Sequence, residues 1–235
     1  MLRSALAHLR PPGPCEVCRQ WSDAAVCGAC QARFGAPQPR CGRCGLRLGA
    51  PAAACGACLR EPPPFEHTVV GVDYGFPWDH VVAEFKFKGR PELADALAAL
   101  LLGAIQRAAL PPPRLVLPVP LAPARLAERG YNQAWELARR LARALGLPAQ
   151  PALLSRPLDQ AHQAELGRSE RLRNLRHAFM VEPARRSALQ GLRVALVDDV
   201  MTTGATAVEA ASALLRAGAA AVDVWVLART PEPGH

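Results

Sequence analysis

Lysine, aromatic residues and long apolar runs are scarce in this sequence of 235 residues. Only two lysines are present, Lys86 and Lys88, against 26 arginines, and aromatic residues make up 5% of the chain. So few rings give weak support to a protein that grips nucleic acid mainly by stacking on its bases. The longest apolar run, Ala96–Ile105, is shorter than the roughly 20 residues that a membrane-spanning helix needs. The first residues also lack the apolar core of a signal peptide, so we expect a cytoplasmic protein without membrane insertion.

Charge is distributed unevenly along the chain. Half of the residues are hydrophobic, which excludes global disorder, and the formal net charge is +8. Residues 112–193 contain 14 arginines and 6 acidic residues, a balance of +8, so the remaining residues balance to zero. A basic middle segment suits an anionic partner, either a phosphorylated small molecule or nucleic acid. The plain alternative is a solvated arginine surface.

All the cysteines lie within the first 58 residues, and all fall in C-x-x-C pairs. The eight are Cys15, Cys18, Cys27, Cys30, Cys41, Cys44, Cys55 and Cys58. Two intervening residues let both sulfurs of a tight turn face one cation, and four thiolates complete a tetrahedral zinc site. A disulfide scaffold belongs to secreted chains, and a redox C-x-x-C motif normally occurs once rather than four times in series.

The cysteine spacing therefore predicts two structural zinc ions. Grouping the first four cysteines and the last four closes the shortest loops and is the preferred arrangement, while an interleaved grouping stays open. A site of four cysteines leaves no open coordination position for catalysis. The expected role is structural, with docking to a partner protein as the alternative.

The composition changes at Glu61, where a proline-rich stretch begins. We expect a double zinc ribbon over residues 1–60, a stiff link over 61–67 and a larger domain over 68–235. Strand patterns at 67–76, 114–121, 192–200 and 220–229, with a weaker one near 149–156, alternate with helical patterns at 78–110, 132–146 and 203–218. The first helical pattern is interrupted at 89–91, and a loop is expected at 122–131. This alternation predicts an α/β fold with a parallel sheet that is covered on both faces.

The stretch VALVDDVMTTGAT, residues 194–206, combines two acids with a small hydroxyl-rich loop at the end of a strand. In parallel sheets, ligands bind where the carboxyl ends of strands meet the loops. The loop leads into a helix, so its free N–H groups and the helix dipole suit a phosphate. The residues of this predicted phosphate loop are Thr202, Thr203, Gly204, Ala205 and Thr206. Asp198 and Asp199 would repel a phosphate, but carboxylates accept hydrogen bonds from the vicinal hydroxyls of a ribose, so the pattern predicts a ribose 5′-phosphate.

These thirteen residues resemble the phosphoribosyl pyrophosphate (PRPP) motif of type I phosphoribosyltransferases. The resemblance implies that Asp198 and Asp199 hold the ribose hydroxyls and act as the catalytic acids, and that residues 202–206 hold the 5′-phosphate. It also implies Mg²⁺ bound together with PRPP.

A narrower resemblance covers Cys15 to Arg229. The segments PVPLAPARLAERGYNQAWELARRLA, DQAHQAELGRSERLRNLRHAF and FKFKGRPELADALAALL, behind a cysteine-rich ribbon, are similar to the ComF family of competence proteins. The family implies a zinc ribbon joined to a type I phosphoribosyltransferase-like domain, linked to uptake of single-stranded DNA in natural transformation. It places Arg125 and Arg129 in the loop that receives pyrophosphate. A mobile loop within residues 157–176 would close over the ligand with Gln163, Arg171 and Asn174.

Two functions follow as expectations. The first is Mg²⁺-dependent transfer of a 5-phosphoribosyl group from PRPP to an acceptor that the sequence does not name. The second is a non-catalytic protein of the transformation machinery that binds single-stranded DNA or senses PRPP, with Trp78, Tyr131 and Trp135 as candidates for base stacking. Other competence proteins are possible partners in both.

Overall fold

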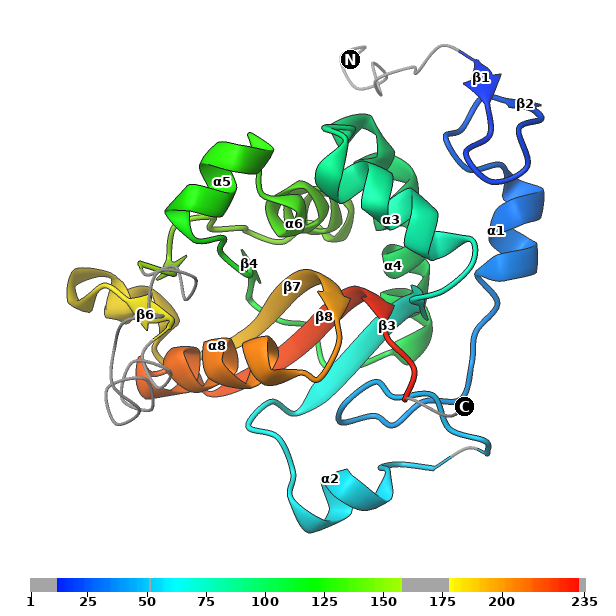
Figure 1. The fold of residues 1–235 in the computed structure, drawn as a ribbon. Coiled ribbons are helices and arrows are strands. Elements are labelled where there is room, and N and C mark those ends of the chain that lie inside the picture. Colours follow the sequence, from blue (N-terminus) through cyan, green and yellow to red (C-terminus); the bar gives the residue numbers. More distant parts are fainter. Residues whose placement is uncertain (1–11, 51, 158–177, 233–235) are drawn as a thin grey trace, which may run out of the picture.

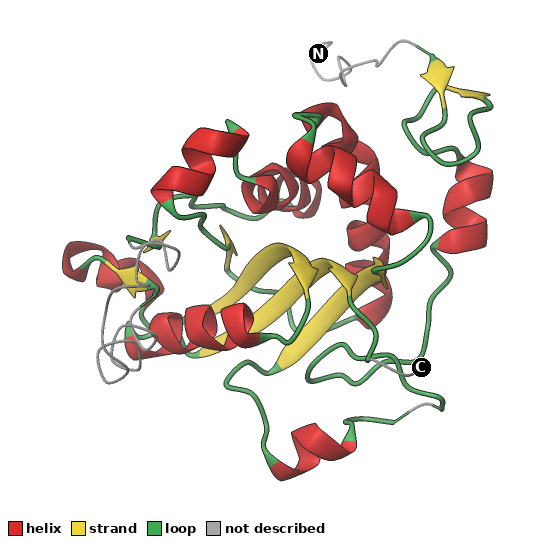
Figure 2. Cartoon of the chain, viewed as in Figure 1, coloured by secondary structure: helices red, strands yellow, loops and turns green. Residues whose placement is uncertain are grey.

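The computed structural model describes residues 12–50, 52–157 and 178–232. Its centre is a parallel four-stranded sheet in the order β3-β8-β7-β4 (Figures 1 and 2). The strands are β3 (His67–Asp73), β4 (Leu115–Pro118), β7 (Arg193–Met201) and β8 (Ala221–Arg229). β7 and β8 are in register over most of their length, from Arg193 opposite Ala221 to Met201 opposite Arg229. The predicted α/β fold with a parallel sheet is confirmed.

Helices cover both faces of this sheet (Figure 1). One face carries α3 (Trp78–Phe87), α4 (Ala94–Ala108) and α6 (Gln133–Leu145), and the other carries α8 (Ala205–Arg216). The core is accordingly divided into two apolar clusters, one beneath α3, α4 and α6 and one beneath α8. The predicted interruption of the first helical pattern is confirmed, because the 3-10 helix η1 (Pro91–Leu93) separates α3 from α4.

Helix α6 shows how local sequence fixes an element. The Asn132 side chain accepts a hydrogen bond from the Trp135 N–H at 3.3 Å, and Gly146 ends the helix with φ of 66°. Leu137 and Leu141 lie on its apolar face and are fully buried, and each such leucine contributes roughly 2 kcal/mol of hydrophobic stabilisation. The helical pattern predicted over residues 132–146 is confirmed.

Two segments differ from expectation. Residues 122–131 were expected to form a loop but contain helix α5 (Pro123–Arg129), because proline is well accommodated in the first turn of a helix. The strand expected near 149–156 shortens to β5 (Leu154–Ser155), which pairs with β6 (Met180–Val181) ahead of the 3-10 helix η3 (Pro183–Leu189).

The cysteine-rich region packs on the α/β core at two separate places. Its elements are β1 (Gly13–Pro14), β2 (Trp21–Ser22), α1 (Gly28–Phe34) and α2 (Gly56–Arg60). The first half lies beside α3, and the second half lies beside β3 near the end of β8 (Figure 1). Cys15 and Cys30 belong to the same apolar cluster as α3 and α4. Within the described residues no helix is long and apolar enough to cross a membrane.

Candidate functional site

The two acids lie within β7, near its carboxyl end and shortly before the turn that leads to α8. We call residues 198–206 the β7–α8 corner. β4 is the neighbour of β7, with Leu115 opposite Val194 and Pro118 opposite Val197, and the two strands run in parallel. The segment that follows β4 therefore begins at the same edge of the sheet as the corner. This is the edge at which α/β folds bind ligands.

Asp199 is paired across the site with one of the two lysines of the chain. Its carboxylate is buried and accepts a hydrogen bond from Lys86 Nζ at 3.1 Å, and Lys86 comes from the last turn of α3. Asp199 Oδ1 also accepts the Val200 N–H at 2.7 Å, while Asp198 Oδ1 accepts the Asp199 N–H at 2.8 Å. Both carboxylates are thus tied to their own backbone, and Lys86 supplies the opposing charge.

The pKa of Asp198 is raised. Burial, and then the negative charge of Asp199, raises the pKa of Asp198 to about 8. The N–H bond from Asp199 and the charge of Lys86 act in the opposite direction and do not offset this rise. A carboxyl that retains its proton can both donate and accept hydrogen bonds, which suits a diol.

A chain of contacts leads from Asp199 to the segment after β4. The carbonyl of Lys86 accepts a hydrogen bond from Gln133 Nε2 at 3.3 Å, and Gln133 Oε1 accepts one from Arg129 Nη1 at 3.1 Å. Arg129 also lies with its guanidinium carbon 5.0 Å from the ring centre of Phe87. A continuous series of contacts therefore links Arg129 to Asp199.

Sequence reasoning missed Lys86 and Gln133. Lys86 lies in the FKFKG segment, and its only sequence signal is the rarity of lysine in this chain. Gln133 is a buried polar residue at the start of α6, and nothing in its local sequence marks it.

The predicted phosphate loop is an open turn. Thr202, Thr203 and Thr206 are exposed, and Gly204 takes φ of 86°, a conformation that favours glycine. The Thr203 hydroxyl accepts a hydrogen bond from the Ala205 N–H at 3.3 Å. The loop precedes a helix of 12 residues, so its N–H groups and the helix dipole face an open space.

The remaining predicted residues fall in different places. Arg125 is exposed on α5, one turn before Arg129. Trp78 is buried, and its Nε1–H donates to the Phe34 carbonyl at 2.8 Å, so its ring is part of the core and is not a stacking surface. The Tyr131 hydroxyl donates to the carbonyl of Phe85, and Trp135 packs partly buried against the core. The mobile-loop residues Gln163, Arg171 and Asn174 lie outside the described residues.

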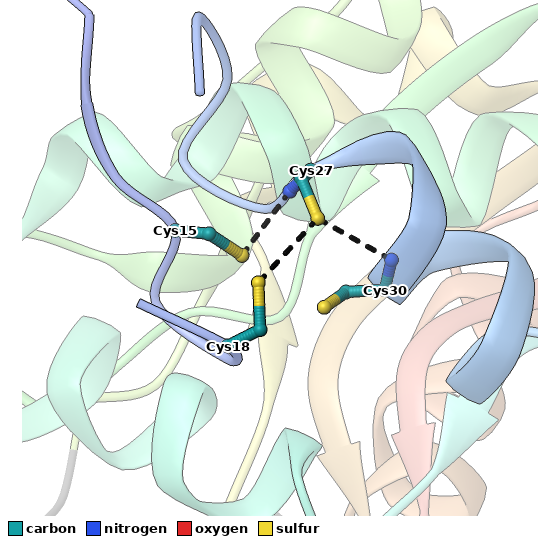
Figure 3. Close-up of side chains that lie close together, drawn as sticks. All are labelled: Cys15, Cys18, Cys27 and Cys30. Carbon is teal, nitrogen blue, oxygen red and sulfur yellow. Dashed lines mark hydrogen bonds between the residues drawn. The ribbon is translucent and has the colours of Figure 1, made fainter. Parts of the chain in front are cut away.

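The eight cysteines form two groups of four in chain order. The first cysteine cluster is Cys15, Cys18, Cys27 and Cys30, and the second is Cys41, Cys44, Cys55 and Cys58; within each group the sulfur atoms lie within 4.8 Å of one another. Figure 3 shows the four sulfurs of the first cluster turned toward a common centre. This geometry favours the sequential grouping over the interleaved one.

The sulfur spacing fits zinc. The Cys18 and Cys27 sulfurs are 3.8 Å apart, as are those of Cys44 and Cys55. Zn–S bonds of about 2.3 Å in a tetrahedron place neighbouring sulfurs about 3.8 Å apart. Both clusters can therefore hold Zn²⁺ with four thiolate ligands.

The pKa values of several cysteines also fit a role as metal ligands. Burial raises the pKa of Cys15, but the N–H groups of the surrounding backbone outweigh it and lower that pKa to about 6. In the same cluster, burial and then the neighbouring cysteines raise the pKa of Cys30 to about 12. In the second cluster the pKa of Cys41 falls to about 7 and that of Cys44 rises to about 11. Metal ligation requires thiolates, so the lowered pKa values of Cys15 and Cys41 suit ligands of a cation.

Known structures give a distant likeness. The glutamine PRPP amidotransferase from *B. subtilis* complexed with ADP and GMP is 21% identical, with a TM-score of 0.44, over 62% of this chain and 30% of that one. Adenine phosphoribosyltransferase from *Leishmania donovani* is 23% identical, with a TM-score of 0.34, over 58% of this chain and 52% of that one. The family assignment rests on sequence relatives instead.

No family model matches the chain. Curated relatives do: the chain is 40% identical over 229 residues to the DNA utilization protein YhgH of *Salmonella typhi*, which covers 94% of this chain and 99% of that protein. It is 35% identical over 175 residues to competence protein F of *Haemophilus influenzae*, over 73% of this chain and 76% of that protein. It is 31% identical over 150 residues to competence protein ComFC of *Bacillus subtilis*, over 63% of this chain and 58% of that protein. The chain therefore belongs to the ComF family, together with competence protein F and the DNA utilization protein YhgH.

Proposed function

We propose that this protein binds PRPP at the β7–α8 corner and serves in the handling of DNA taken up by a cell. One observation supports PRPP binding. Asp198 and Asp199 at the end of β7 are followed directly by the exposed, hydroxyl-rich start of α8, at the edge of a parallel sheet where ligands bind. The second half comes from the names of the relatives, one a DNA utilization protein and two competence proteins. The cytoplasm is the proposed location.

The ribose would lie against the acids, with its 2′ and 3′ hydroxyls donating to and accepting from Asp198 and Asp199. The 5′-phosphate would take the N–H groups and hydroxyls of residues 202–206. Lys86 Nζ donates to the buried Asp199 carboxylate and would hold it in place for the diol. The corner would thus bind two parts of the ligand separately, with the two acids on the ribose hydroxyls and residues 202–206 on the 5′-phosphate.

The pyrophosphate would face Arg129 and Arg125 on α5. Arg129 is already joined to the acids through Gln133 and Lys86. Gln163, Arg171 and Asn174 are proposed to close over the bound ligand and exclude water. Asp198 and Asp199 offer the oxygen ligands that Mg²⁺ prefers, and Mg²⁺ held there with PRPP would supply positive charge to stabilise the leaving pyrophosphate.

The proposed reaction is phosphoribosyl transfer. The lone pair of an acceptor nitrogen forms a bond to C1 of the ribose, the C1–O bond to pyrophosphate breaks with its electrons on oxygen, and the nitrogen releases a proton. Arg129 and Arg125 would stabilise the leaving charge, and the acids would hold the ribose in line. The acceptor is not specified by any feature of the described residues.

Calorimetric titration with PRPP and Mg²⁺ tests the proposal. Wild-type protein is expected to bind, and Asp199→Asn to lose at least about tenfold in affinity, because a diol then loses a charged acceptor. Arg143→Gln on α6 is a matched control that changes charge away from the corner. Failure of the wild-type protein to bind PRPP would rule out the phosphoribosyl proposal.

A second candidate is binding of single-stranded DNA without turnover, favoured by the +8 balance of residues 112–193. Filter binding of an oligonucleotide across a salt series distinguishes the two. Contacts of several arginines with phosphates give a steep loss of affinity with salt. A salt slope near zero would exclude this candidate, whereas a steep slope in a protein that ignores PRPP would favour it.

A further inference from the structure

We propose that Arg229 is a positioning residue that couples the second cysteine cluster to the β7–α8 corner. The coupling is a property of the free protein, and only its consequence for ligand affinity rests on the proposed function. Zinc at the second cluster would then set the shape of the phosphate loop, whereas zinc at the first cluster would not.

Arg229 joins the two features directly. It is the last residue of β8 and is 7% exposed. Its Nε donates a hydrogen bond to the carbonyl of Cys44, a member of the second cluster, at 3.1 Å. Its Nη1 donates to the carbonyls of Met201 at 3.2 Å and Thr202, at the entry to the phosphate loop, and of Thr230 at 2.9 Å. One rigid guanidinium therefore fixes the separation between the cluster and the loop.

The charge of Arg229 needs a partner. Among the described residues Arg229 donates to carbonyl oxygens and forms no ion pair with a carboxylate. A buried cation held by neutral carbonyls alone is costly. Four thiolates around one Zn²⁺ carry a net charge of about −2, and Cys44 belongs to that group. With zinc bound, the second cluster would thus supply the negative charge opposite Arg229.

The second cluster is itself held firmly, so its position can be transmitted. The Thr68 N–H of β3 donates to the Gly42 carbonyl at 2.8 Å, and Arg40 pairs with Asp73 of β3 at 2.7 Å. Gly45, with φ of 71°, lies so close to β3 that an added Cβ would be 2.5 Å from a methyl group of Val70.

The cluster and the loop also line one cleft. Cys44, Cys55 and Cys58 lie on its cysteine side, and Met201, Thr203 and Gly204 lie on its loop side, together with Arg229. Loss of zinc from the second cluster is therefore expected to alter the loop through Arg229 and not through the opposite face of the sheet.

The first cluster provides an internal control. It is held to the helical layer by Glu16, whose carboxylate accepts from Arg90 at 3.0 and 2.8 Å, and by the Trp78 bond to Phe34. Cys27 and Cys55 occupy equivalent positions in the two clusters, and both are half-buried. Cys27→Ser and Cys55→Ser are thus a matched pair.

Hydrogen exchange in the free protein tests the coupling. Amide exchange of the peptide that contains residues 202–208 is expected to speed up about tenfold in Arg229→Met and Cys55→Ser, and to stay unchanged in Cys27→Ser. Exchange in α6 reports global opening in each variant, and the change in exchange of residues 202–208 is judged against it. Arg229→Lys keeps the charge and should restore slow exchange in part, which a loss of packing alone would not. If Arg229→Met fails to fold, Arg229→Lys and Cys55→Ser carry the test.

Titration with ribose 5-phosphate adds a second readout. The dissociation constant is expected to rise about tenfold in Arg229→Met and Cys55→Ser and to be unchanged in Cys27→Ser. If the wild-type protein does not bind ribose 5-phosphate, the proposed function fails while the exchange data still decide the coupling. Unchanged loop exchange in folded Arg229→Met and Cys55→Ser, or equal loop exchange in Cys27→Ser and Cys55→Ser, would overturn the coupling.

Discussion

The two cysteine clusters are both built from two C-x-x-C pairs but attach to the α/β core in different ways. The first gives Cys15 and Cys30 to the apolar core and holds the α3–η1 turn through the Glu16–Arg90 pair. The second forms a small apolar cluster of its own and binds the edge strand β3 and the end of β8 through backbone carbonyls. The same set of four cysteines can therefore anchor different parts of the core, and the contacts around each cluster decide which part it holds.

Loss of a cluster is expected to have the largest effect. Cys15→Ser and Cys41→Ser should each reduce the zinc content from two ions to one and lower the free energy of unfolding by at least about 4 kcal/mol. Zinc quantification and urea unfolding measure both quantities. Variants that retain two zinc ions per chain would contradict the assignment of the eight cysteines as ligands.

The next largest effect is expected from the Glu16–Arg90 ion pair beside the first cluster. Arg90→Met leaves the buried Glu16 carboxylate without its bidentate partner, which should lower the free energy of unfolding by about 2–3 kcal/mol. The double variant Glu16→Gln/Arg90→Met should recover part of this loss, because the buried charge is gone. Neither variant should change amide exchange in residues 202–208. Faster exchange there would show that both clusters control the loop.

A pair of glycine substitutions sharpens the contrast in packing. Gly45→Ala in the second cluster forces a positive φ on alanine and a contact with β3, so it should lower the free energy of unfolding by about 2 kcal/mol. Gly28→Ala in the first cluster meets no atom within 4 Å and begins α1, so it should be neutral or slightly stabilising. Thermal unfolding of the two variants provides the comparison. Equal losses would mean that the two clusters are packed alike.

The effect expected at the β7–α8 corner is a pH dependence of stability. Because the pKa of Asp198 is raised to about 8, the folded protein binds more protons than the unfolded chain between about pH 4 and pH 8, and the free energy of unfolding falls as the pH rises through that range. Asp198→Asn removes this dependence, so the stability of the variant relative to wild type should increase as the pH rises from 4 to 8. Urea unfolding at several pH values tests it. A relative stability that does not increase with pH would contradict the raised pKa.

Features with a local cause were predictable from the sequence. The alternation of strand and helix patterns predicted the parallel sheet, the helical pattern over 132–146 predicted α6, and the shortest loops predicted the grouping of the cysteines. Helix α5 was missed because Pro123 indicates a loop as readily as a first helical turn.

Features that depend on distant partners could not be predicted. Lys86 and Asp199 are 113 positions apart, and Arg229 and Cys44 are 185 apart. No periodicity or motif connects such residues; only the folded sheet brings them together. The acids and the hydroxyl-rich loop could be singled out as candidates because they are contiguous, and the residues that contact them could not because they are distant in the sequence.

The most direct test of the phosphoribosyl assignment is a crystal structure of the protein with PRPP and Mg²⁺. We expect ribose hydroxyls within hydrogen-bond distance of Asp198 and Asp199, and the 5′-phosphate on the N–H groups of residues 203–206. A ligand bound elsewhere, or a corner left empty at saturating PRPP, would contradict it.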